Sequence, residues 1–485
     1  MIGIGSNDDI TLKLGTSTVS KAYWGTTQVY PNAELPYESQ YLTIEALSSG
    51  TFSLNDSANT FSYSTNGGST WSNMDSSTSV SLTNGDKMLL KCSNPILTKS
   101  PNRWNNYGIG IFGSTCNFKV YGNAMSLLYG DNFQNQTALP TLNNDKSVAT
   151  AGYQFNSLFN GCTHVYDAQN LILPATMVGL HSYDTVFYGC TNLTTPPALP
   201  STTLAEYCYS GMFQGCTSLT SAPELPATTS ANYCYSQMFS GCTSLVTAPV
   251  LPATTMTNWC YNSMFYGCTS LTSAPALPAT TLATLCYQSM FRGCTSLTTA
   301  PSVLPATRLA NSCYEQMFLG CTSLTTAPVL PATTLAYNCY SDMFYGCTRL
   351  RTAPSVLPAT TLADYCYHQM FRECTALVTA PVLPATTLAN YCYQQMFQDC
   401  SSLTTAPELP ATTLVTGCYV NMFRDCSSLN YIKAMFTTTP ATSTTNVWVK
   451  GVASRGTFVK NVNATWTTTG NNGVPSGWTV QTASE

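Results

Sequence analysis

One alternation of apolar and polar residues recurs along the middle of the chain with a nearly fixed period. Residues 205–216 read AEYCYSGMFQGC, and close copies continue to residues 415–426, which read VTGCYVNMFRDC. The period is 26 residues and lengthens twice to 27, each time between the same two prolines, in residues 301–305 and 354–358. Insertions confined to one site per repeat fall on one corner of a stacked coil, so the pattern predicts a solenoid.

Each repeat divides into three predicted pieces. Residues 216–223 are β-rich and stop at a proline, and a second proline three residues later keeps residues 223–226 extended. Two threonines follow that can cap a short helix over about residues 231–240, with Gly241 as its left-handed C-terminal cap. Strand, corner and helix predict one turn of a right-handed α/β solenoid, whose parallel strands stack ~4.8 Å apart.

Two cysteines per coil form two columns, which also explain most of the cysteine content. Cysteines eight residues apart at opposite ends of a short helix diverge, so they do not predict a zinc site. Disulfides between successive coils stay geometrically open, but we expect reduced thiols that fill the coil interior as small apolar groups. This structural ladder begins with Cys208, Cys216, Cys234, Cys242, Cys260, Cys268, Cys286 and Cys294, and its second column extends back to Cys190 and Cys162.

The segments outside the repeat alternate like short strands. Residues 10–30 turn at two Gly-Thr pairs and predict two or three strands, while six alternating segments and two Asn-Gly turns predict a β-sandwich. The predicted organisation is therefore all-β at the start and a leucine-rich-repeat type of α/β solenoid after it. Its parts are N-terminal strands (1–37), a β-sandwich-like module (38–126), a lead-in (127–161), about eleven coils (162–429) and a small β-rich C-terminal cap (430–485).

Charge and hydropathy narrow the class of protein. Charged residues make up 8% of the chain and the net charge is −4, so no basic field attracts nucleic acid or an anionic membrane. No stretch of about 18 apolar residues exists, and we therefore expect no membrane insertion. The first residues lack the basic and apolar regions of a secretory signal, which predicts synthesis in the cytoplasm without export by that route.

The sequence contains no catalytic constellation. None of the three histidines belongs to an HExxH motif, acidic residues are scattered along the chain, and no P-loop or GxSxG pattern occurs, so we predict no enzyme, cofactor or metal site. Residues 64–71 resemble the Asp-box hairpin of sialidases, with Asn66 in the aspartate position. A sialidase also needs an arginine cluster, and the chain before the repeats holds one arginine, Arg103. We therefore interpret this segment as a turn that satisfies its own hydrogen bonds.

The remaining candidate for function is the surface of the solenoid. Variation between coils gathers on the predicted helix side, where exposed Tyr, Trp and Arg are residues that stack on sugars and anchor interfaces. A flat ladder of Thr, Ser and Val, interrupted by two arginines, forms the strand side and predicts either a solvent-facing surface or a second contact surface. The candidate binding face comprises Tyr207, Tyr233, Trp259, Tyr266, Arg292, Tyr345, Arg349, Arg351, Tyr365, Arg372 and Tyr391.

The repeated unit MFxGCTSLTxAPxLPATTLAxYCY resembles the BspA-type leucine-rich repeats of surface proteins of gut Bacteroidales and of their phages. The resemblance covers about residues 162–429, and residues 430–478 are similar to the tail that follows such repeats. Residues 10–30 resemble N-terminal segments of phage structural and fibre proteins. The resemblance implies a leucine-rich-repeat fold and a role as an adhesin or host-contact protein, with no catalytic residues. The lack of an export signal or lipid-anchor cysteine favours the phage branch.

These observations predict a non-enzymatic phage virion protein, fibre-like and located on the tail or head. Its N-terminal region would contact other virion proteins, and its solenoid would contact a host surface protein or glycan. A capsid or tail decoration protein with a structural role is one alternative, and an adhesin on a bacterial cell surface is the other. Low charge combined with exposed aromatic residues also favours a homo-oligomer.

Overall fold

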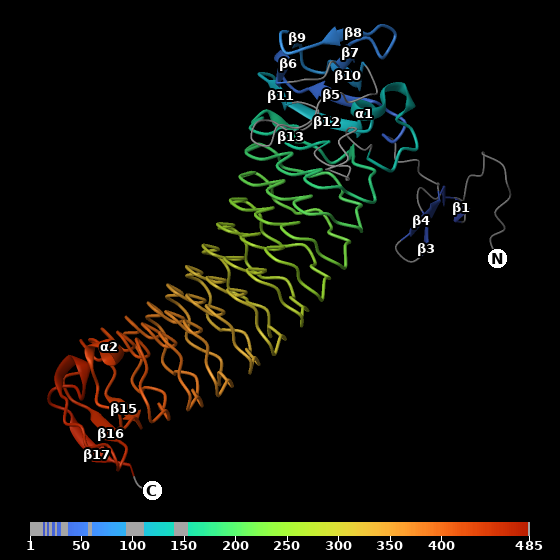
Figure 1. The fold of residues 1–485 in the computed structure, drawn as a ribbon. Helices are drawn as coiled ribbons and strands as arrows, with labels where there is room; N and C mark the ends of the chain where they lie inside the picture. The colour runs from blue at the N-terminus through green and yellow to red at the C-terminus, as the bar shows by residue number, and fades with distance from the viewer. Residues whose placement is uncertain are drawn as a thin grey trace.

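The computed structural model describes residues 37–56, 61–93, 111–139 and 154–483, together with the backbone of four short strands between residues 13 and 30. Stacked coils form a curved rod, with a β module at its N-terminal end and the C-terminus at the opposite end (Figure 1). Among the described residues, no helix combines the length and the apolar character needed to cross a bilayer.

The first strands form two antiparallel hairpins. The pairs flank the two predicted Gly-Thr turns, whose own residues lie outside the described ones. The prediction of strands is confirmed, although the chain forms four instead of two or three. These strands are β1 (Lys13–Leu14), β2 (Ser17–Thr18), β3 (Ala22–Trp24) and β4 (Thr27–Tyr30).

The next segment is a two-layer β module, as predicted. One sheet has the order β12-β5-β10-β7-β8, and the other has the order β11-β6-β9. Phe52 lies between the layers, with its ring centroid 5.4 Å from those of both Phe112 and Phe118. The sequence did not predict β6 and β8, and Ile109 and Gly110 of one expected strand lie outside the described residues. The strands are β5 (Leu42–Ala46), β6 (Gly50–Asp56), β7 (Phe61–Ser64), β8 (Ser72–Met74), β9 (Ser79–Leu82), β10 (Lys87–Cys92), β11 (Ile111–Ser114) and β12 (Phe118–Asn123).

The module closes the end of the solenoid directly. Strand β12 pairs in parallel with β13 and β14 of the first coils, so one sheet runs from the module into the rod. The ring of Phe159, in the first coil, lies 5.7 Å from Phe112 and 6.3 Å from Phe118, which makes the two apolar cores continuous. The connecting elements are α1 (Ser126–Tyr129), η1 (Gly130–Asn132), β13 (Val165–Asp167) and β14 (Leu171–Ile172).

The predicted helix of each coil is wrong. In residues 233–242 every second N–H donates to the carbonyl of the neighbouring coil, as from Tyr235 to Cys260 at 3.0 Å, and the intervening N–H groups bond three residues back. Tyr233, Gln237 and Gly241 have φ of +56°, +57° and +75°. A left-handed residue at every fourth position interrupts a right-handed helix, so this side of the coil is a series of tight turns. The predicted left-handed Gly241 is confirmed.

Two ladders of aromatic rings run through the interior of the rod. A ladder that starts at Phe155 and continues as tyrosines to Tyr419 has ring centroids 5.5–6.0 Å apart and nearly parallel planes. A phenylalanine ladder from Phe159 to Phe423 has spacings of 5.4–5.8 Å. These rings are almost fully buried, and each coil therefore contributes one layer of an unbroken core.

The cysteine columns line the same interior. All 22 cysteines are buried and unpaired with one another. In the second column each thiol from Cys190 to Cys426 donates to the phenylalanine carbonyl of the preceding coil, as from Cys242 to Phe213 at 3.1 Å. Burial raises the pKa of these thiols, with Cys162 at about 11. The thiols thus act as small buried groups that also tie one coil to the next.

The strand side of the solenoid is reduced to single parallel bridges, such as Ser221 to Thr247 and Thr247 to Ser273. A bridge from Thr405 to Tyr431 continues this ladder into a three-stranded parallel sheet at the C-terminal end. Trp448 packs there on Tyr419 and Phe423, the last rings of the two ladders. The C-terminal elements are β15 (Tyr431–Ala434), α2 (Thr442–Thr445), β16 (Thr457–Lys460), η2 (Gly470–Asn472) and β17 (Thr479–Thr482).

Candidate functional site

The turn side of the coils carries a row of aromatic residues in a backbone conformation that favours glycine. The position before the first cysteine has φ between +52° and +60° in successive coils, but most coils place a large side chain there. A left-handed residue with a Cβ costs about 1 kcal/mol relative to glycine. The side chains at this position are His181, Tyr207, Tyr233, Trp259, Leu285, Ser312, Asn338, Tyr365 and Tyr391, and we call the aromatic ones the ring row.

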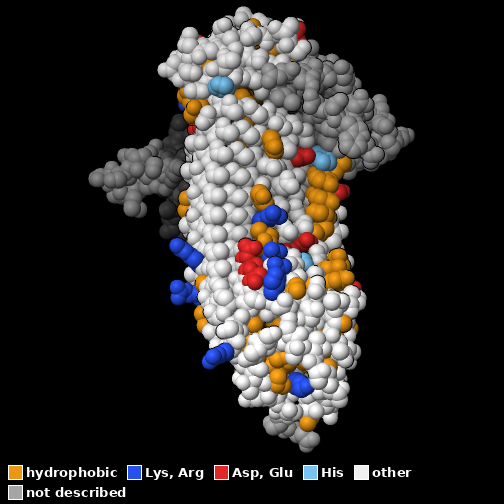
Figure 2. Space-filling view, turned by 90° about the vertical axis from the view of Figure 1, so that its left-hand side faces the viewer, with side chains coloured by type: hydrophobic (Ala, Val, Ile, Leu, Met, Phe, Trp, Pro, Cys, Tyr) orange, Lys and Arg blue, Asp and Glu red, His pale blue; other side chains and the backbone are white. Residues whose placement is uncertain are grey.

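The rings of the ring row stack on one another along the rod. Tyr207 lies between His181 and Tyr233, with centroids 4.4 Å and 4.3 Å away, and Trp259 continues the stack at 5.5 Å. Figure 2 shows hydrophobic side chains gathered in such a row along one edge of the face. A second stack joins Tyr365 and Tyr391 at 4.7 Å.

This stacking changes how the row can meet a ligand. Inside each stack the faces of a ring are covered by its neighbours, and the face of Tyr391 lies over Gly417. The expectation that individual rings offer their faces to sugars is therefore wrong for residues inside the stacks. Each stack instead presents a line of half-buried ring edges, which carry the positive end of the ring quadrupole and the tyrosine hydroxyls.

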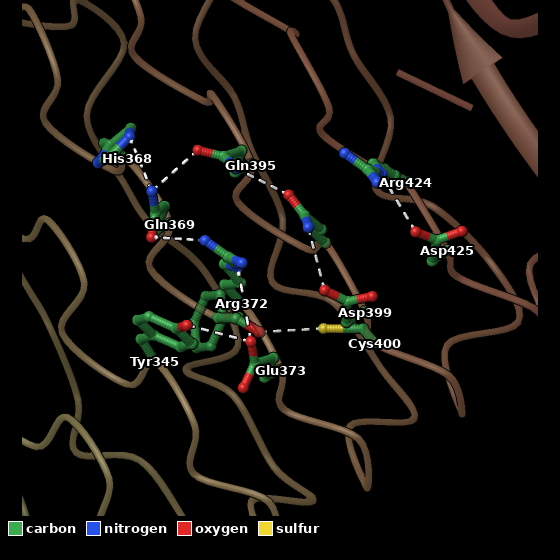
Figure 3. A network of polar contacts seen from close by, with 12 residues as sticks. Tyr345, His368, Gln369, Arg372, Glu373, Gln395, Asp399, Cys400, Arg424 and Asp425 are labelled. Carbon is green, nitrogen blue, oxygen red and sulfur yellow. Dashed lines mark hydrogen bonds and ion pairs between the residues drawn. The ribbon is translucent and has the colours of Figure 1, made fainter. Parts of the chain in front are cut away.

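A polar network lies beside the ring row and is centred on Arg372 (Figure 3). The guanidinium lies 4.9 Å from the ring centroid of Tyr345, donates to Gln369 Oε1 at 3.3 Å, and lies 3.7 Å from Glu373 Oε1. The Tyr345 hydroxyl donates to the same Glu373 oxygen at 3.1 Å. Because each group contacts the next, these contacts hold the guanidinium in one orientation on the surface.

The network continues through neighbouring coils. Gln369 donates to Gln395, Gln395 to Gln398, and Gln398 to Asp399, at 2.8, 2.8 and 3.1 Å. Toward the other end of the rod, Arg292 lies 5.7 Å from the Tyr266 ring. Figure 2 shows the acidic and basic side chains grouped next to the hydrophobic row. The face therefore combines apolar ring edges with fixed polar groups.

Several titratable groups of this face are partly desolvated. Burial raises the pKa of Glu315 and Asp342, because their charged forms lose water. Burial, followed by the charge of Arg372, lowers the pKa of His368 to about 4. At the N-terminal end of the row, burial raises the pKa of Asp184 although its carboxylate lies 2.7 Å from His181 Nδ1.

The structure brings most of the predicted face together but not all of it. Tyr207, Tyr233 and Trp259 form one stack, Tyr365 and Tyr391 another, while Tyr266 with Arg292 and Tyr345 with Arg372 form two cation–π pairs. Arg349 and Arg351 lie apart from these contacts, on the exposed strand side next to the bridge residue Thr352.

Sequence reasoning missed polar members of the face and one ring. His181 occupies the ring-row position of a coil whose first cysteine is replaced by Ser182, and reading that column one coil further upstream would have found it. Glu315, Asp342 and His368 lie in columns that vary in residue type, and their partial burial has no sequence signal.

The Asp-box-like segment is a turn that bonds to itself. Asn66 Oδ1 accepts from Ser64 Oγ at 2.8 Å and from the Thr70 N–H at 3.0 Å, while its amide donates to Thr70 Oγ1. Across the described ranges, no three or more His, Cys, Asp or Glu side chains converge as a metal site.

The fold and its surface define a leucine-rich-repeat solenoid that carries stacked rings and a polar network on one face. The chain belongs to the family of BspA-type leucine-rich-repeat proteins, because the family model "BspA type Leucine rich repeat region" matches it in six copies over residues 156–298, 253–370 and 315–444, more than half of its length.

Two solved structures are similar to the chain. A leucine-rich repeat protein from Bacteroides ovatus is 16% identical, with 64% of this chain and 82% of that chain covered and a TM-score of 0.33. TLR13, solved in a complex with ssRNA13, is 14% identical, with 63% and 48% of the two chains covered and a TM-score of 0.22. Among curated proteins, none matches the chain.

Proposed function

We propose that this BspA-type protein is a non-enzymatic adhesion protein that binds a surface glycan or protein through the ring row and its neighbouring polar network. The observation that carries the proposal is the placement of Tyr and Trp at left-handed positions. Glycine would occupy them without strain, as Gly417 does in the same column. Strained residues concentrate where a side chain has a task, and the aromatic ones among the strained residues here line up on one side of the rod in two stacks.

The rigidity of the rod supports this role. Aromatic edges, amides and a fixed guanidinium are groups that anchor interfaces, and holding them in place beforehand lowers the entropy lost on binding. The same proposal includes a rod of about eleven coils that ends in a C-terminal cap. The number of coils would determine how far the ring row extends from the N-terminal module.

We further propose that the protein is a virion component with fibre-like geometry. Its N-terminal hairpins would dock on other virion proteins, and the solenoid would project toward the host from the virion surface. The resemblance of residues 10–30 to phage structural proteins and the location of the ring row beyond the β module support this arrangement.

Immunogold labelling of purified phage particles with an antibody to residues 150–430 tests the location. Label on a projecting fibre or tail tip is expected. Label confined to the head shell would favour a decoration protein, and absence from virions together with label on bacterial cells would favour the bacterial adhesin.

Binding of the full chain to Bacteroides cells and to immobilised mucin tests the adhesive role and separates a bacterial receptor from a mucosal one. We expect saturable binding to one of these two surfaces. Binding to neither surface, or release of sugars from a panel of glycans by the purified protein, would contradict the proposed function.

A further inference from the structure

A second surface of the solenoid, separate from the ring row, is apolar and exposed. Between the two prolines of its corner each coil places an exposed residue directly before a buried leucine, and in six successive coils that exposed residue is valine or alanine. Val250 is 78% exposed, and Val329 and Val382 are each 60% exposed. We call this column the valine stripe, which consists of Val250, Ala276, Val303, Val329, Val356 and Val382.

The backbone around the valine stripe is rigid and forms a shallow groove. Parallel bridges join Val303 to Val329 and Val356 to Val382, and prolines flank every member. Between the coils of Val250 and Ala276 lies a groove of about 280 Å³ lined by Ala, Pro, Val and Leu residues alone. Soluble proteins rarely expose a contiguous apolar surface of this kind without a partner, and the fixed prolines lose little entropy when covered.

Charged residues lie at both ends of the valine stripe and favour one orientation of a bound partner. Glu224 occupies the stripe position one coil before Val250, and Glu408 occupies it one coil after Val382. Glu408 pairs with Lys433 at 2.9 Å, whereas Glu224 is exposed and forms no ion pair with any described residue. Arg349 and Arg351, exposed in the coil of Val356, likewise have no ion-pair partner within the described part of the chain.

We infer that the valine stripe binds a second copy of this chain in antiparallel orientation, about a two-fold axis between the coils of Ala276 and Val303. This register places Ala276 against Val303 and Val250 against Val329. The coil of Glu224 then meets the coil of Arg349 and Arg351 of the other copy, twice by symmetry. A parallel pair would instead bring identical charges of the two copies together. An antiparallel pair with one copy shifted by two coils would place Glu224 of each copy opposite Glu408 of the other, which is a repulsive contact.

Sedimentation velocity of the full chain at a series of concentrations tests this inference. We expect a dimer whose dissociation constant rises at least about tenfold in Val250→Glu, with no change in Val462→Glu, an exposed valine near the C-terminus and outside the stripe. Glu224→Arg and Arg351→Glu should each weaken the dimer, and the double variant should restore it.

Unchanged thermal melting of each variant would show that the fold is intact. A wild-type chain that stays monomeric at about 100 μM, where a dimer of micromolar affinity would form, would overturn the inference. A trimer, or a charge-swapped double variant as weak as either single one, would overturn it as well. Because the valine stripe and the ring row are different surfaces, Val250→Glu should leave binding to cells or mucin through the proposed adhesive face measurable.

Discussion

At the scale of single residues, two tyrosines of the buried ladder pack alike but differ in whether their hydroxyl groups form hydrogen bonds. The Tyr209 hydroxyl donates to Ser201 Oγ at 2.9 Å, whereas the buried hydroxyl of Tyr235 has no partner. Tyr209→Phe should lower the free energy of unfolding by about 1 kcal/mol, and Tyr235→Phe should leave it unchanged or raise it. Chemical denaturation of the two variants checks the difference, and an equal loss in both would contradict it.

His368 should make the rod sensitive to acid. Its pKa falls from 6.5 in the unfolded chain to about 4 in the fold, because burial and Arg372 both disfavour the imidazolium. The contribution of neutral His368 to the free energy of unfolding is fully present above pH 6.5. It is lost as the pH falls toward 4, because the unfolded chain takes up the proton first.

His368→Gln isolates this contribution from the surrounding carboxyl groups. The imidazole ring is surrounded by Ser341, Tyr365, Gln369 and Arg372. The carboxyl groups of Asp342 and Glu315 have raised pKa values, so their protonation favours the folded state as the pH falls, which is opposite to the effect of His368. This carboxyl contribution is present in both proteins. Denaturation between pH 7 and pH 4 should show a smaller loss of stability in the variant. An identical pH dependence in the two proteins would exclude this role of His368.

At the scale of the element, the turn side of the coil depends on left-handed residues. Gln237 has φ of +57° and an exposed side chain, and the same column holds Gly211. Gln237→Gly should raise the free energy of unfolding by about 0.5–1 kcal/mol, because glycine adopts this conformation without strain. Gly241→Ala, at φ of +75°, should lower it by about 1 kcal/mol although its Cβ would make ordinary contacts. Opposite signs in thermal melting are expected, and equal signs would contradict the strain argument.

The sequence predicted the solenoid and its interior but not the conformation of one side. The period, the proline corner and the cysteine columns determine the repeat, because each coil must present the same buried residues to its neighbour. Cys234 and Met238 lie four residues apart, a spacing that also fits a helix. The backbone N–H groups instead donate to the next coil, and these hydrogen bonds have no signature in the sequence. The pattern of Tyr and Trp located the ring row, while the covering of ring faces by neighbouring rings depends on stacking between coils.

The cysteine columns give a second prediction at this scale. Burial raises the pKa of thiols throughout both columns, so the thiolate needed for reaction is scarce at neutral pH. A maleimide reagent should label almost none of the 22 thiols in the native protein and all of them in denaturant. Rapid labelling of the native columns would show that the thiols are accessible.

At the scale of the whole molecule, the rod should tolerate the loss of a complete coil. Deletion of residues 243–268, one full period, joins equivalent positions and leaves both aromatic ladders in register. Deletion of residues 243–255 instead sets turn residues against strand residues and should prevent cooperative folding. Circular dichroism and thermal melting distinguish the two outcomes, and a folded half-coil deletion would contradict the dependence on register.

Binding by ring-row variants of the full chain tests whether the ring row is the adhesive surface. Tyr233→Ser with Trp259→Ser removes two stacked rings from the turn side. The matched control is Val246→Ser with Thr272→Ser, which changes two exposed residues on the strand side of the same coils. Binding to Bacteroides cells or mucin should weaken at least about tenfold in the ring-row variant and stay unchanged in the control. Full binding by a folded ring-row variant would show that the ring row is not the adhesive surface.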